Sequence, residues 1–323
     1  MKQALIGAWL LLGIGLTGQT AGPFLLVLNK TDSTLAIVEP ASGRTVASVP
    51  TGPGPHEVTV SSDGRFALVT NYGGGTPGNT LSVIDLFARK EVRRVDLGDL
   101  RRPHGLTFTG GKAVFTAESN RAIARYDPGT GQVDWRFATD QDGTHMVLAS
   151  ADGRTLFTSN IGSNTISIIE AAGSAWRQTL VGVGPGPEGL DLSPDGRELW
   201  TAHTGDGRVT VIDVAARKVT QTFDVGARRA NRLKFTRDGR LVLISDLDGG
   251  ALLIVDTQTR AVRKRLPLGR MPEGILVRPD GRIAYVAIAA DNRIAAIDLQ
   301  TLEVVQTIAA GGGPDGMAWV PGP

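Results

Sequence analysis

The sequence contains no cysteine among its 323 residues. Disulfides, thiol catalysis and thiolate metal sites are therefore excluded. A large excess of either sign of charge is also lacking, because the chain has 34 Lys and Arg and 32 Asp and Glu. The net charge therefore gives no strong indication of a nucleic-acid or membrane partner. Helix signals are scarce, whereas glycine is abundant, with 42 residues. Many short strands joined by tight turns are typical of such a composition.

An apolar run from Ala4 to Thr17 is too short for a comfortable membrane span. It follows Lys2 and precedes small residues, as in a secretory signal peptide. We therefore expect residues 1–21 to be a signal peptide and residues 22–323 to form a single exported domain. The mature protein would be periplasmic or secreted, without a membrane span, and we expect a monomer.

A four-strand pattern recurs along the chain and can be aligned by its tight turns. The turns are Asp63-Gly64, Gly110-Gly111, Asp152-Gly153, Asp195-Gly196, Asp238-Gly239 and Asp280-Gly281, and successive ones lie 47, 42, 43, 43 and 42 residues apart. A fixed period of about 40–45 residues with four strands per unit is typical of β-propeller blades. An acid recurs once per unit, for example at Asp85 and Asp298, and we interpret it as an acceptor of backbone hydrogen bonds in a turn.

The two ends of the chain complete one another. The last unit stops at Val320, where its turn is due, and residues 24–29 (FLLVLN) match the strand that should follow this turn. The sequence thus predicts an all-β, seven-bladed propeller with four antiparallel strands per blade. Its last blade would combine three N-terminal strands with one C-terminal strand, which removes the free sheet edges.

The units resemble YVTN-type propeller repeats, which occur in exported, YncE-like bacterial and archaeal proteins. The segments that carry the resemblance are SVIDL, GPHEVTVSSDGRFALVTN, GPEGLDLSPDGRELWTAH and MPEGILVRPDGRIAYVA, and it covers residues 24–320. The segment PHEVTVSSDGRFALVTNYG is also similar, more distantly, to seven-bladed lactonases. These resemblances imply a propeller fold, and the second implies lactone hydrolysis.

The first residue of each innermost strand falls in register, and all seven of these residues are polar. They are His56, His104, His145, Glu188, Asn231, Glu273 and Asp315. Because innermost strands line the central channel of a propeller, we expect these side chains to surround one mouth of the channel.

A second, largely polar row stands at the end of the following strand. Pairing across a tight hairpin would place His56 opposite Asn71 and Glu188 opposite His203. We therefore expect Asn71, Asn160, His203 and Asp246 to share the mouth with the first row, which would gather all four histidines there.

Several functions stay open. His56, His104, His145 and Glu188 together suit a divalent metal, although polar strand ends at a water-filled mouth need no ligand. Arginines on nearby loops, Arg102, Arg229 and Arg270, favour a small anionic ligand.

We interpret the chain as a binding or scaffold module for a small molecule or a protein partner. The alternative is a lactonase-like or metal-dependent hydrolase whose catalytic residues the sequence does not identify. A third hypothesis is an accessory subunit of an electron-transfer enzyme, by analogy of fold alone.

Overall fold

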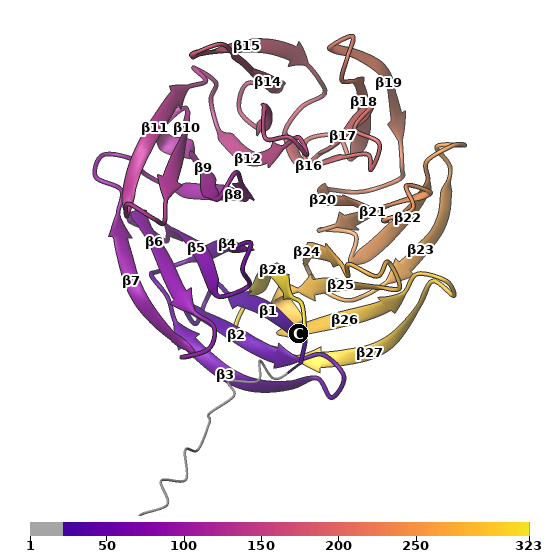
Figure 1. Cartoon of the computed structure of the whole chain (residues 1–323). Coiled ribbons are helices and arrows are strands. Elements are labelled where there is room, and N and C mark those ends of the chain that lie inside the picture. The colour runs from indigo at the N-terminus through magenta and orange to yellow at the C-terminus, as the bar shows by residue number, and fades with distance from the viewer. Residues whose placement is uncertain (1–21, 323) are drawn as a thin grey trace, which may run out of the picture.

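The computed structural model describes residues 22–322, so the predicted signal peptide at 1–21 lies outside the described residues. Within this part of the chain, 28 strands form seven four-stranded antiparallel sheets around a central axis (Figure 1). The predicted seven-bladed β-propeller is thus confirmed. No helix of the described part is long and apolar enough to cross a membrane.

Each blade contributes one strand to each of four concentric positions. The innermost strands are β4 (Pro55–Val60), β8 (Pro103–Thr109), β12 (Thr144–Ala149), β16 (Pro187–Leu192), β20 (Ala230–Phe235), β24 (Pro272–Val277) and β28 (Pro314–Val320). The second strands are β5 (Phe66–Gly73), β9 (Lys112–Ala117), β13 (Thr155–Asn160), β17 (Glu198–His203), β21 (Leu241–Asp246), β25 (Ile283–Ile288) and β1 (Phe24–Asn29).

The outer half of each blade completes the sheet. The third strands are β6 (Pro77–Asp85), β10 (Ala122–Asp127), β14 (Thr165–Ala172), β18 (Arg208–Asp213), β22 (Ala251–Asp256), β26 (Arg293–Asp298) and β2 (Thr34–Glu39). The outermost strands are β7 (Lys90–Asp96), β11 (Gln132–Ala138), β15 (Ala175–Gly182), β19 (Lys218–Asp224), β23 (Val262–Pro267), β27 (Glu303–Ala309) and β3 (Arg44–Pro50). Two short 3-10 turns, η1 (Glu118–Asn120) and η2 (Ala289–Asp291), follow β9 and β25.

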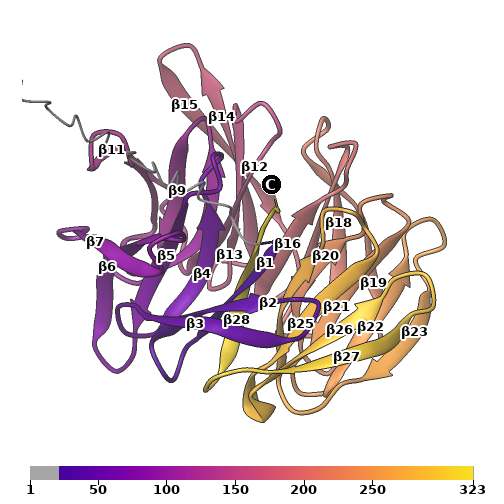
Figure 2. The same ribbon diagram turned by 60° about the horizontal axis from the view of Figure 1, so that its bottom comes forward.

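The closing blade has the predicted composition, with the strand order β28-β1-β2-β3. Phe24 pairs with Val320 and Leu25 with Trp319, so the two ends of the chain share one ladder. Figure 2 shows β28 beside β1 in a view turned by 60° from that of Figure 1. This pairing covers the inner edge of β1, which would otherwise be open.

Local turn chemistry explains the regularity of the blades. Asp63 accepts a hydrogen bond from the backbone N–H of Arg65 at 3.0 Å, and Gly64 takes the left-handed conformation with φ of 70°. The carboxylate of Asp85 accepts the N–H groups of Phe87 and Ala88 at 3.0 and 2.9 Å. The predicted turn role of the recurring acids is therefore confirmed at this position.

The apolar core lies between neighbouring blades. One cluster combines Leu243 and Ile254 of one blade with Ile275 and Val286 of the next. Trp200, the largest fully buried side chain, packs against Phe235 of the adjacent blade with ring centroids 5.4 Å apart. A single blade could not bury these faces, so the closed ring itself is the stable unit.

Candidate functional site

Every innermost strand begins with a β-bulge that changes which side chains enter the channel. In the first such hairpin Pro55 pairs with Asn71 and Val58 with Val69, so the inner strand has one extra residue. The same shift occurs in all seven blades of the described part. Two consecutive residues, His56 and Glu57 in this blade, are therefore released from the ladder.

A hydroxyl group of the second strand stabilises the bulge and links neighbouring blades. The Thr70 Oγ1 accepts the N–H of Glu57 at 3.1 Å and donates to the carbonyl of His104 at 2.8 Å. Thr116 repeats this arrangement between Gly105 and the carbonyl of His145, at 2.8 and 2.7 Å. These hydrogen bonds fix the backbone of His104 and of His145 relative to the preceding blade.

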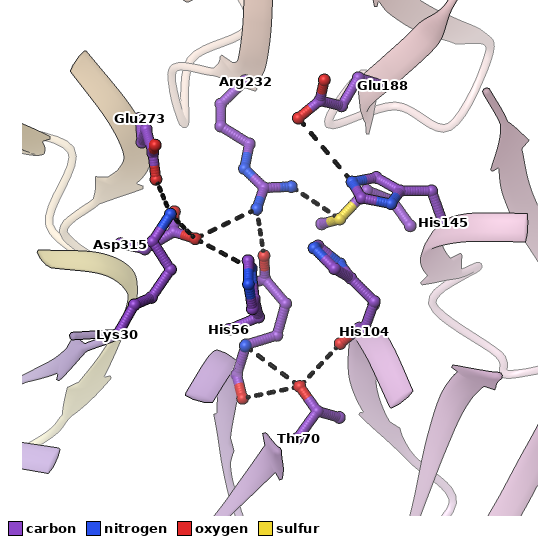
Figure 3. A network of polar contacts seen from close by, with 12 residues as sticks. Lys30, His56, Thr70, His104, His145, Glu188, Arg232, Glu273 and Asp315 are labelled. Carbon is purple, nitrogen blue, oxygen red and sulfur yellow. Dashed lines mark hydrogen bonds and ion pairs between the residues drawn. The ribbon is translucent and has the colours of Figure 1, made fainter. Parts of the chain in front are cut away.

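The first bulge residues of the seven innermost strands lie at one end of the channel, and we call them the mouth ring: His56, His104, His145, Glu188, Asn231, Glu273 and Asp315. Three neighbouring blades supply a row of imidazoles, with centroid separations of 4.6 Å between His56 and His104 and 3.8 Å between His104 and His145 (Figure 3). The ring of Tyr72 lies 4.8 Å from that of His56.

Asp315 is the buried anion of the mouth ring. Its Oδ2 lies 3.3 Å from His56 Nδ1, 3.3 Å from Lys30 Nζ and 3.7 Å from an Arg232 nitrogen. Burial alone would raise the pKa of Asp315, but the charges of Lys30 and Arg232 hold it well below its usual range. Asp315 is therefore a carboxylate at neutral pH.

The imidazoles differ in charge. Burial lowers the pKa of His56 despite the opposing effect of Asp315, and burial together with His145 lowers that of His104 well below its usual range. Burial would also lower the pKa of His145, yet the hydrogen bonds with Glu118 and Glu188 raise it. His56 and His104 are thus neutral, with a more basic His145 beside them.

The second bulge residues meet across the channel axis. Arg232 Nη2 lies 2.8 Å from Glu57 Oε1, and Arg232 Nη1 donates to the Met146 sulfur at 2.8 Å. These residues come from β20, β4 and β12, whose blades are not neighbours. We call Glu57, Met146 and Arg232 the central trio; together they close the channel below the mouth ring.

The other four blades have glycine at the second bulge position: Gly105, Gly189, Gly274 and Gly316. A Cβ atom on Gly274 would lie 2.2 Å from the carbonyl oxygen of Asp315, and one on Gly316 would lie 2.2 Å from that of His56. Glycine there lets adjacent inner strands approach closely.

The predicted second row does not line the mouth as expected. The bulge pairs Pro55, and not His56, with Asn71, and Pro187, and not Glu188, with His203. Asn71, Asn160, His203 and Asp246 are all fully buried. The prediction was wrong because it assumed a hairpin without an extra residue.

These four side chains serve local structure within their blades. Asn71 and Asn160 donate to hydroxyl groups of the third strand. His203 Nδ1 lies 3.2 Å from Asp206, and Asp246 accepts three loop N–H groups. The four histidines are thus divided, with three in the mouth ring and His203 beside Asp206.

The three predicted anion-binding arginines lie in different surroundings. Arg102 covers the ring of Tyr72 at 4.7 Å, Arg270 is paired with Asp291 at 2.7 Å, and Arg229 is exposed. Their role toward an anion stays a prediction.

The metal hypothesis receives no geometric support. Among residues 22–322, no group of three His, Cys, Asp or Glu side chains is arranged to hold a metal ion. The imidazole rings of His56, His104 and His145 form a row in which neighbouring rings are tilted by 43° and 33°. A shared ion would require their nitrogens to converge on one point.

Several residues of the site were absent from the predicted set: Lys30, Glu57, Tyr72, Glu118 and Arg232. Glu118 contacts His145 at 3.2 Å because Ala117, and not Glu118, stands opposite Pro103. The signal that could have identified Glu57 and Arg232 is the glycine that follows the ring residue in four blades, which marks the second position as special.

The family model described as Cytochrome D1 heme domain matches residues 109–278. No curated protein matches the chain in sequence. The similarity to YVTN repeats stays a prediction, because the matching family is a different one.

Solved propellers superpose over most of the chain. The periplasmic gluconolactonase PpgL of Pseudomonas aeruginosa gives a TM-score of 0.71 at 22% identity over 93% of this chain and 99% of that chain. Dihydro-heme d1 dehydrogenase NirN in complex with DHE gives 0.62 at 18%, over 91% and 74%. Hydrazine synthase of Kuenenia stuttgartiensis gives 0.70 at 20%, over 82% and 89%. At these identities the similarity establishes the fold.

Proposed function

Because this chain belongs to the Cytochrome D1 heme domain family, we propose that its mouth ring binds a heme-type tetrapyrrole, with His56 as the side chain that contacts the iron. The main observation in support of this proposal is the contact between His56 and Asp315. The chain would thus act as a binding module, one of the roles expected from its sequence.

His56 has the properties of a side chain that would hold a heme iron. Its side chain keeps 21% of its surface exposed, whereas that of Asp315 behind it keeps 2%. An imidazole that binds a metal commonly gives its other nitrogen to a carboxylate, which orients the ring and raises its basicity. The lowered pKa of His56 supplies the neutral form that a metal requires.

The surroundings of His56 fit a planar organic ligand with carboxylate groups. Tyr72 and His104 add aromatic surface beside His56, and the exposed Arg229 could pair with a propionate. The central trio occupies the channel axis, so we assign the ligand to the mouth. A bound heme would supply one-electron redox chemistry or ligand exchange at its iron.

Titration with ferric heme, followed by the Soret band, tests this proposal. We expect stoichiometric binding with a shifted band, loss of the shift in His56→Ala, and an affinity reduced by about 10- to 100-fold in Asp315→Asn. Iron-free protoporphyrin is the matched probe, since its affinity should not depend on His56. Equal heme spectra for the wild type and His56→Ala would contradict the assignment.

Lactone hydrolysis is the second candidate, and the same residue pair favours it. A buried carboxylate that holds a neutral imidazole is the arrangement of a general base, and PpgL is named a gluconolactonase. His56 would activate water for attack on the lactone carbonyl. Acid release from glucono-1,5-lactone, measured in a pH-stat with wild type and His56→Ala, tests it. Identical rates for the two proteins would rule it out.

We also propose a periplasmic location, since PpgL is described as periplasmic and the sequence predicts a signal peptide. Cell fractionation tests it, with the full-length chain compared with one that begins at residue 22. Recovery of both in the cytoplasm would contradict it. A protein partner at the mouth remains the alternative occupant.

A further inference from the structure

The residue before each innermost strand has an unusual backbone conformation. In six blades it is left-handed, with φ between 53° and 68°, and four of these six residues are glycine: Gly54, Gly143, Gly186 and Gly313. The two exceptions are Arg102 and Met271, with φ of 53° and 56°. Both precede a proline, which restricts their backbone further.

The carbonyl of this residue accepts a backbone hydrogen bond from near the end of the second strand, in the left-handed blades and also at Arg229, which is not left-handed. The carbonyl of Gly54 accepts the N–H of Tyr72 at 3.0 Å, and that of Gly186 accepts the N–H of Thr204 at 2.8 Å. The carbonyls of Arg102 and Met271 accept equivalent bonds from Glu118 and Ala289, at 3.1 and 2.9 Å. A residue with a Cβ atom that is left-handed here, as Arg102 and Met271 are, loses stability relative to glycine.

Met271 has a second unfavourable feature, the exposure of an apolar side chain to solvent. Its side chain is 43% exposed, although it is apolar, and it belongs to none of the apolar clusters between the described blades. Backbone strain at an exposed residue beside the proposed ligand site is the observation that points to a role outside the fold itself.

Arg102 and Met271 precede the innermost strands of two blades on opposite sides of the ring. Arg102 precedes β8 and Met271 precedes β24. Two blades separate them on one side of the ring and three on the other. Arg102 offers a cation above the ring of Tyr72, whereas Met271 offers a flexible thioether that packs well against aromatic surfaces.

We infer that Arg102 and Met271 are kept in place of glycine because they contact the ligand from opposite sides of the mouth, Arg102 at an anionic group and Met271 at an apolar, planar surface. The inference rests on the proposed function and adds a requirement to it. The ligand must be wide enough to span the mouth and must be anionic at one edge.

The decisive variant is Met271→Gly, because it removes the strain and the side chain together. We expect its Tm to rise by about 2 °C and its affinity for ferric heme to fall at least about fivefold. Met271→Leu should retain the affinity of the wild type. Arg102→Lys keeps the charge but loses the planar guanidinium, and its affinity should also fall.

Arg89→Gly is the matched control. Arg89 is exposed and left-handed, with φ of 52°, but it lies in the turn after β6, at the end of the blade away from the mouth. Its Tm should rise and its heme affinity should not change.

The outcomes separate the two proposals. Wild type that binds heme with an affinity unchanged by Met271→Gly and Arg102→Lys overturns the inference and leaves the proposed function standing. Wild type that does not bind heme overturns both. Reduced affinity in Met271→Gly with a raised Tm supports both, because a merely structural role would lower affinity only through lower stability.

Discussion

Lys30 and Glu273 form an ion pair although 243 positions separate them in the chain. Lys30 follows β1 in the closing blade, and Glu273 lies in β24 of the neighbouring blade. Asp315 is a second partner of Lys30 at 3.3 Å. The charged network of Lys30, Glu273 and Asp315 thus joins residues from both ends of the chain. Protonation of its members should therefore change the free energy of unfolding of the whole propeller.

The first prediction concerns pH. Burial, reinforced by Asp315, raises the pKa of Glu273 from 4.5 to about 7 in the folded protein. The folded state therefore holds this proton more tightly than the unfolded state, and the free energy of unfolding should fall as pH rises from about 4.5 to about 7. Glu273→Gln removes this contribution, so its stability relative to wild type should increase across that range. Urea unfolding at each pH measures the difference.

Glu303→Gln, on the outermost strand β27, is the control for this measurement. Its stability difference from wild type should be less dependent on pH. Parallel pH profiles for Glu273→Gln and wild type would contradict the prediction.

The second prediction concerns Asp315. Removal of one partner from a buried ion pair leaves the other charges uncompensated, which typically costs about 3–5 kcal/mol. Asp315→Ala should lower the free energy of unfolding by about that amount, because Arg232 and Lys30 lose a common anion. Asp238→Asn, an exposed turn residue, should have a much smaller effect in the same denaturation assay. Equal effects would refute the role of the network.

The third prediction tests the close approach of the inner strands. A Cβ atom on Gly274 would lie 2.2 Å from the Asp315 carbonyl oxygen, whereas nothing lies within 4 Å of one on Gly75. Gly274→Ala should destabilise the protein by at least about 1–3 kcal/mol, and Gly75→Ala should have little effect. Thermal unfolding of both variants decides, and a Gly274→Ala Tm equal to that of wild type would be inconsistent with this packing.

The fourth prediction concerns closure. Deletion of residues 314–323 removes β28 and exposes the inner edge of β1. An unpaired edge invites association with other chains, so the truncated protein should lose its cooperative unfolding transition and aggregate. Calorimetry and light scattering measure both properties. A soluble truncated chain with a wild-type transition would show that the ring is stable without closure.

Local chemistry accounts for what the sequence could predict. Asp63-Gly64 and its equivalents specify tight turns by themselves, so the number of blades and the closure follow from their spacing. The mouth ring was predicted because His56 and its equivalents begin strands. The bulge depends instead on contacts between blades, such as that of Thr70 with the carbonyl of His104. No local pattern specifies that contact, and this is why the extra residue of the inner strand was not predicted and Asn71 was misplaced.

The central trio meets at the channel axis, so the channel is obstructed at that level. Four of the seven second bulge positions are already glycine, so Glu57, Met146 and Arg232 alone supply side chains at that level of the channel. Their replacement by glycine would open a passage for water and small ions from one face of the protein to the other. The permeability of the axis thus depends on three positions, of which Glu57 and Arg232 belong to no apolar cluster and Met146 packs against one between blades.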